Sequence, residues 1–127
     1  GDEMLAFTRG LSEVDEPDLW RKDLTGTILQ WIETGLPDER RLLKACGRAG
    51  QVVVLAYGRN AAIWWASMAS KLERARNLKV YVLPVESTQK LASLADRNMT
   101  LHFNVQDATV WVSSDKGDAQ IEIQALN

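Results

Sequence analysis

Gln51-Val52-Val53-Val54-Leu55-Ala56-Tyr57 is an almost wholly apolar run near the middle of the 127-residue chain. A strand with one face in solvent alternates apolar and polar side chains, whereas a strand that is covered on both faces is apolar throughout. Parallel strands of α/β proteins have this second pattern, because helices pack on both sides of their sheet. The run therefore predicts a central strand of an α/β sheet.

The segment before this run extends the prediction. Ile28–Glu33 alternates in two registers, as a strand does, and Gly35 is expected to end it. A helix is expected between the two strands, with Pro37 at its first helical position. Asp38 and Glu39 then fall in the first turn, where carboxylates interact favourably with the helix dipole. A strand, a helix and a second strand in this order are typical of an α/β fold.

The rest of the chain continues with alternating elements and contains no internal repeat. We expect a short strand over Leu5–Leu11, a helical turn over Asp18–Asp23, a helix over Ala61–Asn77 capped by Asn60, a strand over Leu78–Leu83 and a helix over Gln89–Asn98. Three further segments predict an antiparallel meander with a turn at Asp115–Asp118, namely Thr100–Gln106, Val110–Ser114 and Ala119–Leu126. Together they predict one α/β domain over residues 1–127, with a mixed sheet flanked by helices and a C-terminal antiparallel meander.

Composition and charge narrow the class of protein. With 46% hydrophobic and 25% charged residues the chain is globular, and its apolar runs are too short to cross a membrane. Residues Gly1–Met4 do not resemble the start of a signal peptide, and the single Cys46 cannot form an internal disulfide, which favours the cytoplasm. No glycine-rich nucleotide-binding motif is present, so no small-molecule cofactor is expected. The net charge of −2 argues against a protein that is basic throughout, but it leaves room for a local basic patch that binds DNA or RNA.

Two loops follow the carboxyl ends of the predicted parallel strands, which is where α/β sheets bind their ligands. The first loop, Gly35–Asp38, comes directly after Glu33, and the second is Gly58–Asn60. Carboxylates that meet at the end of a strand are suitable ligands for Mg²⁺, which prefers oxygen donors. Glu33 and Asp38 are therefore candidate site residues.

The helix after the first loop carries basic side chains. Arg40, Lys44 and Arg48 follow one another at four-residue intervals and form one ridge that could contact phosphate. A structural interpretation of the same residues is equally open. Glu33 is then a solvated charge at a strand end, Asp38 serves the helix dipole, and the basic ridge is a solvated helix face.

Short motifs that differ from one another follow in a fixed order along nearly the whole chain. They are Phe7-Thr8-Arg9-Gly10-Leu11, Asp15-Glu16-Pro17-Asp18-Leu19-Trp20, Trp31-Ile32-Glu33, Gly35-Leu36-Pro37-Asp38-Glu39-Arg40-Arg41, Lys44-Ala45-Cys46, Trp64-Trp65 and Asp96-Arg97-Asn98-Met99-Thr100-Leu101. Each motif alone is weak, but the ordered set resembles the bacterial YaeQ family. That resemblance implies a restriction-endonuclease-like fold, a variant of the PD-(D/E)XK nuclease fold. It does not settle a reaction or a substrate.

In the superfamily that this family resembles, a Pro-Asp pair precedes a Glu-x-Lys on a neighbouring strand. Pro17-Asp18 and Glu33-Thr34-Gly35 form a degenerate version of that pattern, with Gly35 at the lysine position. Lys44 on the next helix is the candidate for a migrated lysine. The resemblance thus implies a site with catalytic residues Glu33, Asp18, Lys44 and Asp38, with Mg²⁺ held by Glu33 and Asp18, and with phosphate contacted by Arg40 and Arg48.

The chain departs from the family pattern in two ways. Relatives carry an N-terminal strand pair and a helix before the segment that matches Leu5, and that helix brings a further acid to the site. The domain is therefore expected to be N-terminally incomplete. Relatives also have an acid two residues before the Trp of Trp31-Ile32-Glu33, where this chain has Leu29. Because Leu29 and Glu33 lie on one face of a strand, the change removes a candidate metal ligand.

Two classes of function remain open. The first is Mg²⁺-dependent hydrolysis of phosphodiesters in DNA or RNA, in which the metal lowers the pKa of a bound water and neutralises charge on the phosphate. The second is a non-catalytic descendant of the nuclease fold that binds nucleic acid or a protein partner, whose identity the sequence leaves unknown. Leu29 and Gly35 favour the second class, because each replaces a residue that the chemistry uses.

Overall fold

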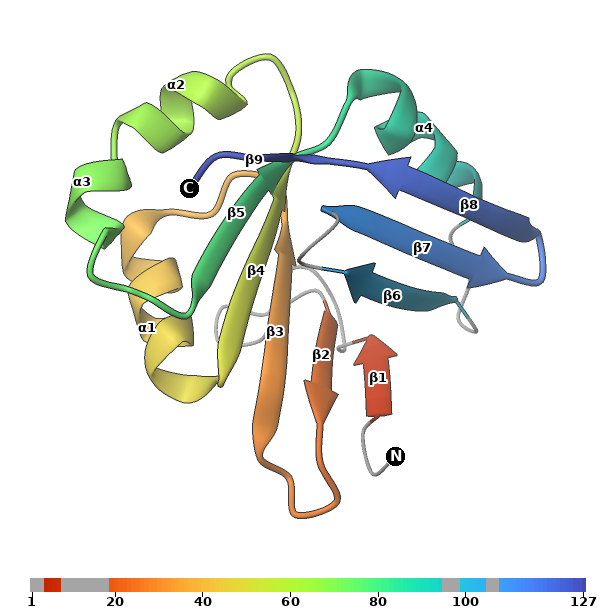
Figure 1. Ribbon diagram of the computed structural model, residues 1–127, viewed down its shortest axis with the longest axis horizontal. Helices are drawn as coiled ribbons and strands as arrows, with labels where there is room; N and C mark the ends of the chain where they lie inside the picture. The colour runs from red at the N-terminus through yellow and green to blue at the C-terminus, as the bar shows by residue number, and fades with distance from the viewer. Residues whose placement is uncertain (1–3, 8–18, 95–98, 105–107) are drawn as a thin grey trace.

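The computed structural model describes residues 4–7, 19–94, 99–104 and 108–127. Its main sheet has six strands in the order β1-β2-β3-β4-β5-β9 (Figure 1). These strands are β1 Met4–Phe7, β2 Leu19–Lys22, β3 Ile28–Thr34, β4 Gln51–Ala56, β5 Leu78–Val82 and β9 Gln124–Ala125. The central strands β3, β4 and β5 are parallel, whereas β1, β2 and β9 pair antiparallel with their neighbours. The predicted mixed sheet is therefore confirmed.

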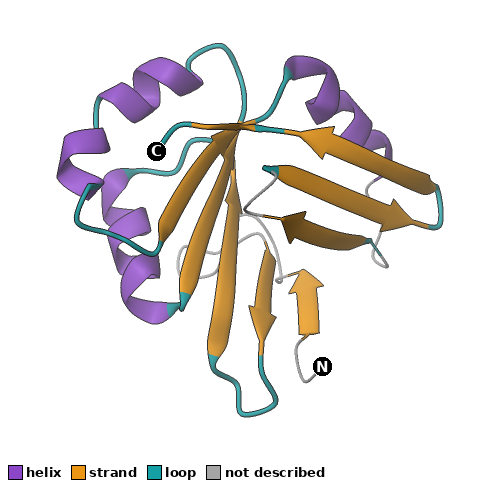
Figure 2. Ribbon diagram, in the orientation of Figure 1, coloured by secondary structure: helices purple, strands orange, loops and turns teal. Residues whose placement is uncertain are grey.

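The two faces of the main sheet are covered by different layers (Figure 2). Three helices cover one face, namely α1 Glu39–Arg48, α2 Ala61–Ala66 and α3 Ala69–Leu72. The other face packs against α4 Val85–Leu94 and a second sheet of three antiparallel strands, namely β6 Thr100–Asn104, β7 Thr109–Ser114 and β8 Gly117–Glu122.

Strand β4 lies between these layers and is buried on both faces. Val52 and Val54 pack toward α1–α3, and Val53 and Leu55 pack toward α4 and the second sheet. The three valines have no exposed surface, and Leu55 has 3%. The interpretation of the central apolar run as a strand covered on both faces is confirmed.

The predicted helix over Ala61–Asn77 is wrong, because the segment forms two short helices. Helix α2 ends at Ala66, and Met68 has a non-helical φ of −131°. The Ser67 hydroxyl donates a 2.6 Å hydrogen bond to the carbonyl of Trp64, so it competes with the helical bonding of the backbone. Asn60 occupies the N-cap position as expected, but its side chain makes no capping hydrogen bond.

The predicted helical turn over Asp18–Asp23 is also wrong where the structure describes it. Residues 19–22 form β2, and Trp20 pairs with Trp31 of β3. Pairing with β3, across the short connection Asp23–Thr27, outweighed the local turn tendency. Asp23 begins the connecting turn, where hydrogen bonds from the Thr25 hydroxyl and the backbone of Thr27 and Thr25 lower the pKa of its carboxyl. Asp18 and residues 8–11 lie outside the described residues.

The C-terminal segment Ala119–Leu126 was predicted as one strand, but it belongs to two sheets. Strand β8 ends at Glu122, the buried Ile123 follows, and β9 then pairs antiparallel with β5 of the main sheet. The turn at Asp115–Asp118 is confirmed as a two-residue connection between Ser114 and Gly117. Gly117 has a φ of +137°, a conformation that side chains rarely adopt.

Some helices and strands begin or end a few residues away from their predicted limits. Helix α4 begins at Val85, four residues before the expected start, and residues 95–98 of the predicted helix lie outside the described residues. Within the described ranges no helix is long and apolar enough to cross a bilayer.

The orientation of α1 on the sheet predicts different losses of stability when two neighbouring leucines of this helix are replaced. Leu42 has no exposed surface, whereas Leu43 is 46% exposed. Leu42→Ala should lower the free energy of unfolding by about 2–5 kcal/mol, because it leaves a cavity. Leu43→Ala should change it by less than about 0.5 kcal/mol. Urea denaturation of both variants measures the difference, and equal losses would contradict the assigned helix orientation.

Candidate functional site

Glu33 lies at the carboxyl end of β3, on the face that α1 covers. Its side chain is buried, with 4% of the residue exposed. The indole Nε1 of Trp31 donates a 2.8 Å hydrogen bond to Glu33 Oε1, and Arg41 Nε of α1 forms a 2.8 Å ion pair with the same oxygen. The interpretation of Glu33 as a solvated charge is therefore wrong. Its carboxylate is a buried polar link between the sheet and α1.

Asp38 is the N-cap of α1. Its Oδ1 accepts a 2.8 Å hydrogen bond from the backbone N–H of Arg41, and the helix begins at Glu39. Pro37 therefore precedes the cap, and the prediction that it is the first helical residue is wrong by two positions. Asp38 fixes the backbone of Arg41 while Glu33 binds its side chain. The two acids thus contact the same residue from different directions.

The loop between β3 and α1 favours a glycine at position 35. Gly35 has a φ of +95°, which is strained for any residue with a side chain, and its N–H bonds to the carbonyl of Leu55. A Cβ at Gly35 would also lie 3.9 Å from the Tyr57 hydroxyl. The carbonyl of Pro37 accepts a 2.8 Å hydrogen bond from the indole of Trp64, which fastens this loop to α2. A lysine at position 35 would require a different loop.

The predicted basic ridge of α1 is exposed. Arg40, Lys44 and Arg48 all have exposed side chains. The guanidinium carbon of Arg48 lies 5.2 Å from the ring centroid of Trp31, within the range of a cation–π contact. Trp31 thus contacts Glu33 through its N–H and Arg48 through its ring face. The ridge remains a candidate for phosphate contact.

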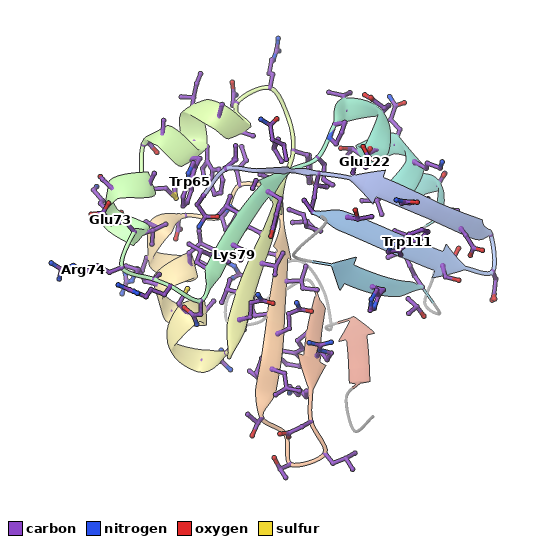
Figure 3. The ribbon with its side chains drawn as sticks, in the orientation of Figure 1. Trp65, Glu73, Arg74, Lys79, Trp111 and Glu122 are labelled. Carbon is purple, nitrogen blue, oxygen red and sulfur yellow. The ribbon has the colours of Figure 1, made fainter. Side chains whose placement is uncertain are left out.

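A second group of basic residues lies alongside α1. The Asn77 amide donates to the carbonyls of Cys46 and Ala49, which holds the α3–β5 turn against the C-terminal end of α1. Lys71 of α3 approaches Glu39 of α1 at 3.7 Å. Lys71, Arg74 and Arg76 are further exposed cations on α3 and this turn, and Figure 3 shows Arg74 pointing away from the helical layer. We define the basic surface as Arg40, Lys44, Arg48, Lys71, Arg74 and Arg76.

The sequence prediction missed the uneven distribution of charge along the chain. Nine basic and three acidic residues lie between positions 38 and 79, a net charge of +6. The rest of the chain has six basic and fourteen acidic residues, a net charge of −8. The two values nearly cancel in the total of −2, so the total hides the asymmetry. Charge counted by segment would have located the extended basic surface.

The described donor set does not fit Mg²⁺. Glu33 Oε1 already accepts hydrogen bonds from an indole and a guanidinium, and a bound metal would lie beside the positive charge of Arg41. Leu29, on the same face of β3, offers no oxygen ligand. In the ranges that the structure describes, no three His, Cys, Asp or Glu residues are grouped to hold a metal ion. Asp18 lies outside those ranges, so its predicted role stays a prediction.

Cys46 lies in α1 near these residues. It is half-buried and packs against the helix-side core. Burial raises the pKa of its thiol, which keeps the thiol protonated near neutral pH and weakens it as a nucleophile. Its environment fits a packing role.

The chain matches known proteins over almost its whole length. A family described as YaeQ protein matches residues 1–123. Proteins named uncharacterized protein YaeQ from Escherichia coli K12 and Salmonella typhi are each 46% identical over 126 residues, which is 98% of this chain and 69% of the relative. The crystal structure of YaeQ protein from Xanthomonas axonopodis pv. citri is similar with a TM-score of 0.74 at 40% identity, covering 97% of this chain and 70% of that chain. The YaeQ protein from Pseudomonas syringae gives 0.73 at 34% identity, covering 97% and 68%.

The pairing of Glu33 with Arg41 predicts a specific loss of stability. Arg41→Ala should lower the free energy of unfolding by about 2–3 kcal/mol, because it leaves the buried Glu33 carboxylate without this guanidinium. Arg41 is partly exposed, so the loss should be smaller than for a fully buried ion pair. Arg40→Ala, at an exposed neighbouring position, should cost less than about 0.5 kcal/mol. Adding Glu33→Gln to Arg41→Ala should recover part of the loss. Chemical denaturation of the wild type, Arg41→Ala, Glu33→Gln and the double variant tests the pair, with Arg40→Ala as the control, and strict additivity of the two changes would refute the coupling.

Proposed function

The chain belongs to the YaeQ family, and we propose that it is a non-catalytic nucleic-acid-binding module with a restriction-endonuclease-like fold of the PD-(D/E)XK type. The observation that carries this proposal is the charge asymmetry. The segment from residue 38 to residue 79 carries +6 in a protein whose remaining residues carry −8. A surface of one sign attracts a polyanion and orients its approach. The proposed setting is the cytoplasm.

The arrangement of the basic surface supports contact with a phosphate backbone. Its residues come from α1, α3 and the α3–β5 turn, which the Asn77 amide holds together. All six side chains are exposed, so they can reach phosphates without a change in the fold. The Lys71–Glu39 contact at 3.7 Å is an exposed ion pair, which contributes little energy and can be exchanged for a phosphate. Several such contacts would bind nucleic acid with little dependence on sequence.

The environment of Glu33 supports binding rather than hydrolysis. The Glu33 carboxylate accepts from Trp31 and Arg41, and these contacts fasten α1 to β3. We therefore assign Glu33 a positioning role: it holds the helix that carries Arg40, Lys44 and Arg48. Leu29 supports the same conclusion, because it stands where a second carboxylate would be needed.

Nucleic-acid binding is tested with two variants of equal charge change. Arg74→Ala with Arg76→Ala should weaken binding of a fluorescein-labelled DNA duplex or RNA strand. The slope of log K against log salt should fall in magnitude by about 0.9 for each duplex phosphate that the variant no longer neutralises. Lys90→Ala with Lys116→Ala removes two cations from α4 and the β7–β8 turn and should leave binding unchanged. Fluorescence anisotropy over a salt series measures both.

Equal weakening by the two double variants would point to a non-specific charge effect and contradict the assigned surface. No measurable binding of DNA or RNA at low salt would refute the nucleic-acid proposal and favour the protein-binding form of the module.

A second candidate function is Mg²⁺-dependent phosphodiester hydrolysis. The position of Glu33 favours it, since the residue lies near the carboxyl end of a parallel strand and beside Arg41. We expect no cleavage of DNA or RNA in a titration with Mg²⁺ or Mn²⁺, because the described oxygen donors do not fit the metal. Cleavage that Glu33→Gln abolishes in a protein of unchanged thermal stability would overturn the non-catalytic proposal and restore the catalytic roles predicted for Glu33 and Lys44.

A further inference from the structure

A cavity of about 490 Å³ lies at the carboxyl ends of the parallel strands β4 and β5. Three segments line it: the loop after β4, the connection from β5 to α4, and the link from β8 to β9. Its volume is within the range of sites for small molecules. Ligands of α/β sheets bind at this end of the strands. The cavity is distinct from the basic surface, because none of the six basic residues lines it.

Two oppositely charged side chains line this cavity from distant parts of the chain. Arg59 follows β4, and Glu122 ends β8. Both are exposed, and with the residues that the structure describes neither forms an ion pair or a side-chain hydrogen bond. Figure 3 shows Glu122 near α4. One side of the cavity therefore attracts an anionic group and the other a cationic group.

The lining between these two charges is mainly apolar. Leu83, Val85 and Ile123 contribute aliphatic side chains, and Val85 is 69% exposed. Val85 is also the first residue of α4, a ten-residue helix. An aliphatic body with charged ends matches this lining.

We propose that this cavity binds a small zwitterion with an aliphatic body, namely an aliphatic amino acid or a short aliphatic peptide. Its carboxylate pairs with the Arg59 guanidinium, and its ammonium group pairs with the Glu122 carboxylate. Its side chains contact Leu83, Val85 and Ile123. Binding forms no covalent bond.

The charges disfavour two other kinds of ligand. A polyanion such as nucleic acid would bring its phosphates against Glu122, and a lone cation would meet Arg59. A neutral apolar molecule would leave both charges without a partner in a partly desolvated site, which is unfavourable. A zwitterion satisfies both charges at once.

The experiment is calorimetric titration of the full chain with L-leucine and with leucyl-leucine as probes. Binding of at least one is expected, and comparison of the two separates an amino-acid site from a peptide site. N-acetylation of the probe removes the ammonium and amidation removes the carboxylate, and each should weaken binding about tenfold or more, because each removes one charge-assisted contact. Arg59→Gln and Glu122→Gln should weaken binding of the unmodified probe to a similar extent.

Two matched variants serve as controls. Lys116→Gln and Asp118→Asn remove one exposed charge of each sign outside the cavity and should leave probe binding unchanged. A further check compares two probes on one variant. Glu122→Gln should weaken binding of the unmodified probe but not of the N-acetylated probe, because the N-acetylated probe has no ammonium group that could pair with Glu122. The proposal is overturned if neither probe binds, if the modified probes bind as tightly as the unmodified ones, or if the cavity variants and the controls act alike.

Discussion

The fold depends on the burial of β4 from both sides. Val52, Val53 and Val54 have no exposed surface, and they alternate between the helical layer and the layer of α4 and the second sheet. Each fully buried aliphatic side chain contributes roughly 1.5–3 kcal/mol, and here one strand contributes to two cores. Either layer alone would leave half of this strand in water. The helices and the second sheet lie where they cover one of its two faces.

The polar contacts around Glu33 lie at the edge of this apolar arrangement. The carboxylate, the indole of Trp31 and the guanidinium of Arg41 satisfy one another where α1 crosses the end of β3. Burying such a group costs free energy unless its partners are in place, so the contacts specify one orientation of the helix. That orientation places Arg40, Lys44 and Arg48 outward. In this way a buried acid sets the position of an exposed basic surface, which links the packing of the sheet to the proposed function.

The sequence predicted elements with strong local patterns and missed those whose structure depends on pairing or packing with another element. The apolar run of β4 and the alternation of β3 were sufficient to predict both strands, and the β7–β8 turn was equally clear. Strand β2 was mistaken for a helical turn because it has only four residues, too few for a clear alternation, and its structure depends on pairing with β3. At the site the sequence identified Glu33 and the α1 ridge. It could not reveal Arg41 as the ionic partner, nor the basic residues that the Asn77 amide brings beside α1.

The passage of the chain from β8 into β9 has a consequence for how the protein unfolds. Strands β7 and β8 are joined by a two-residue turn, so they can form early from local contacts. Strand β9 pairs with β5 of the main sheet, and the N–H of Leu126 adds a hydrogen bond to the carbonyl of Val80. The buried Ile123 lies between the two strands and ties the two sheets into one cooperative unit. Backbone amides of both sheets should then exchange with solvent through a common global opening rather than sheet by sheet.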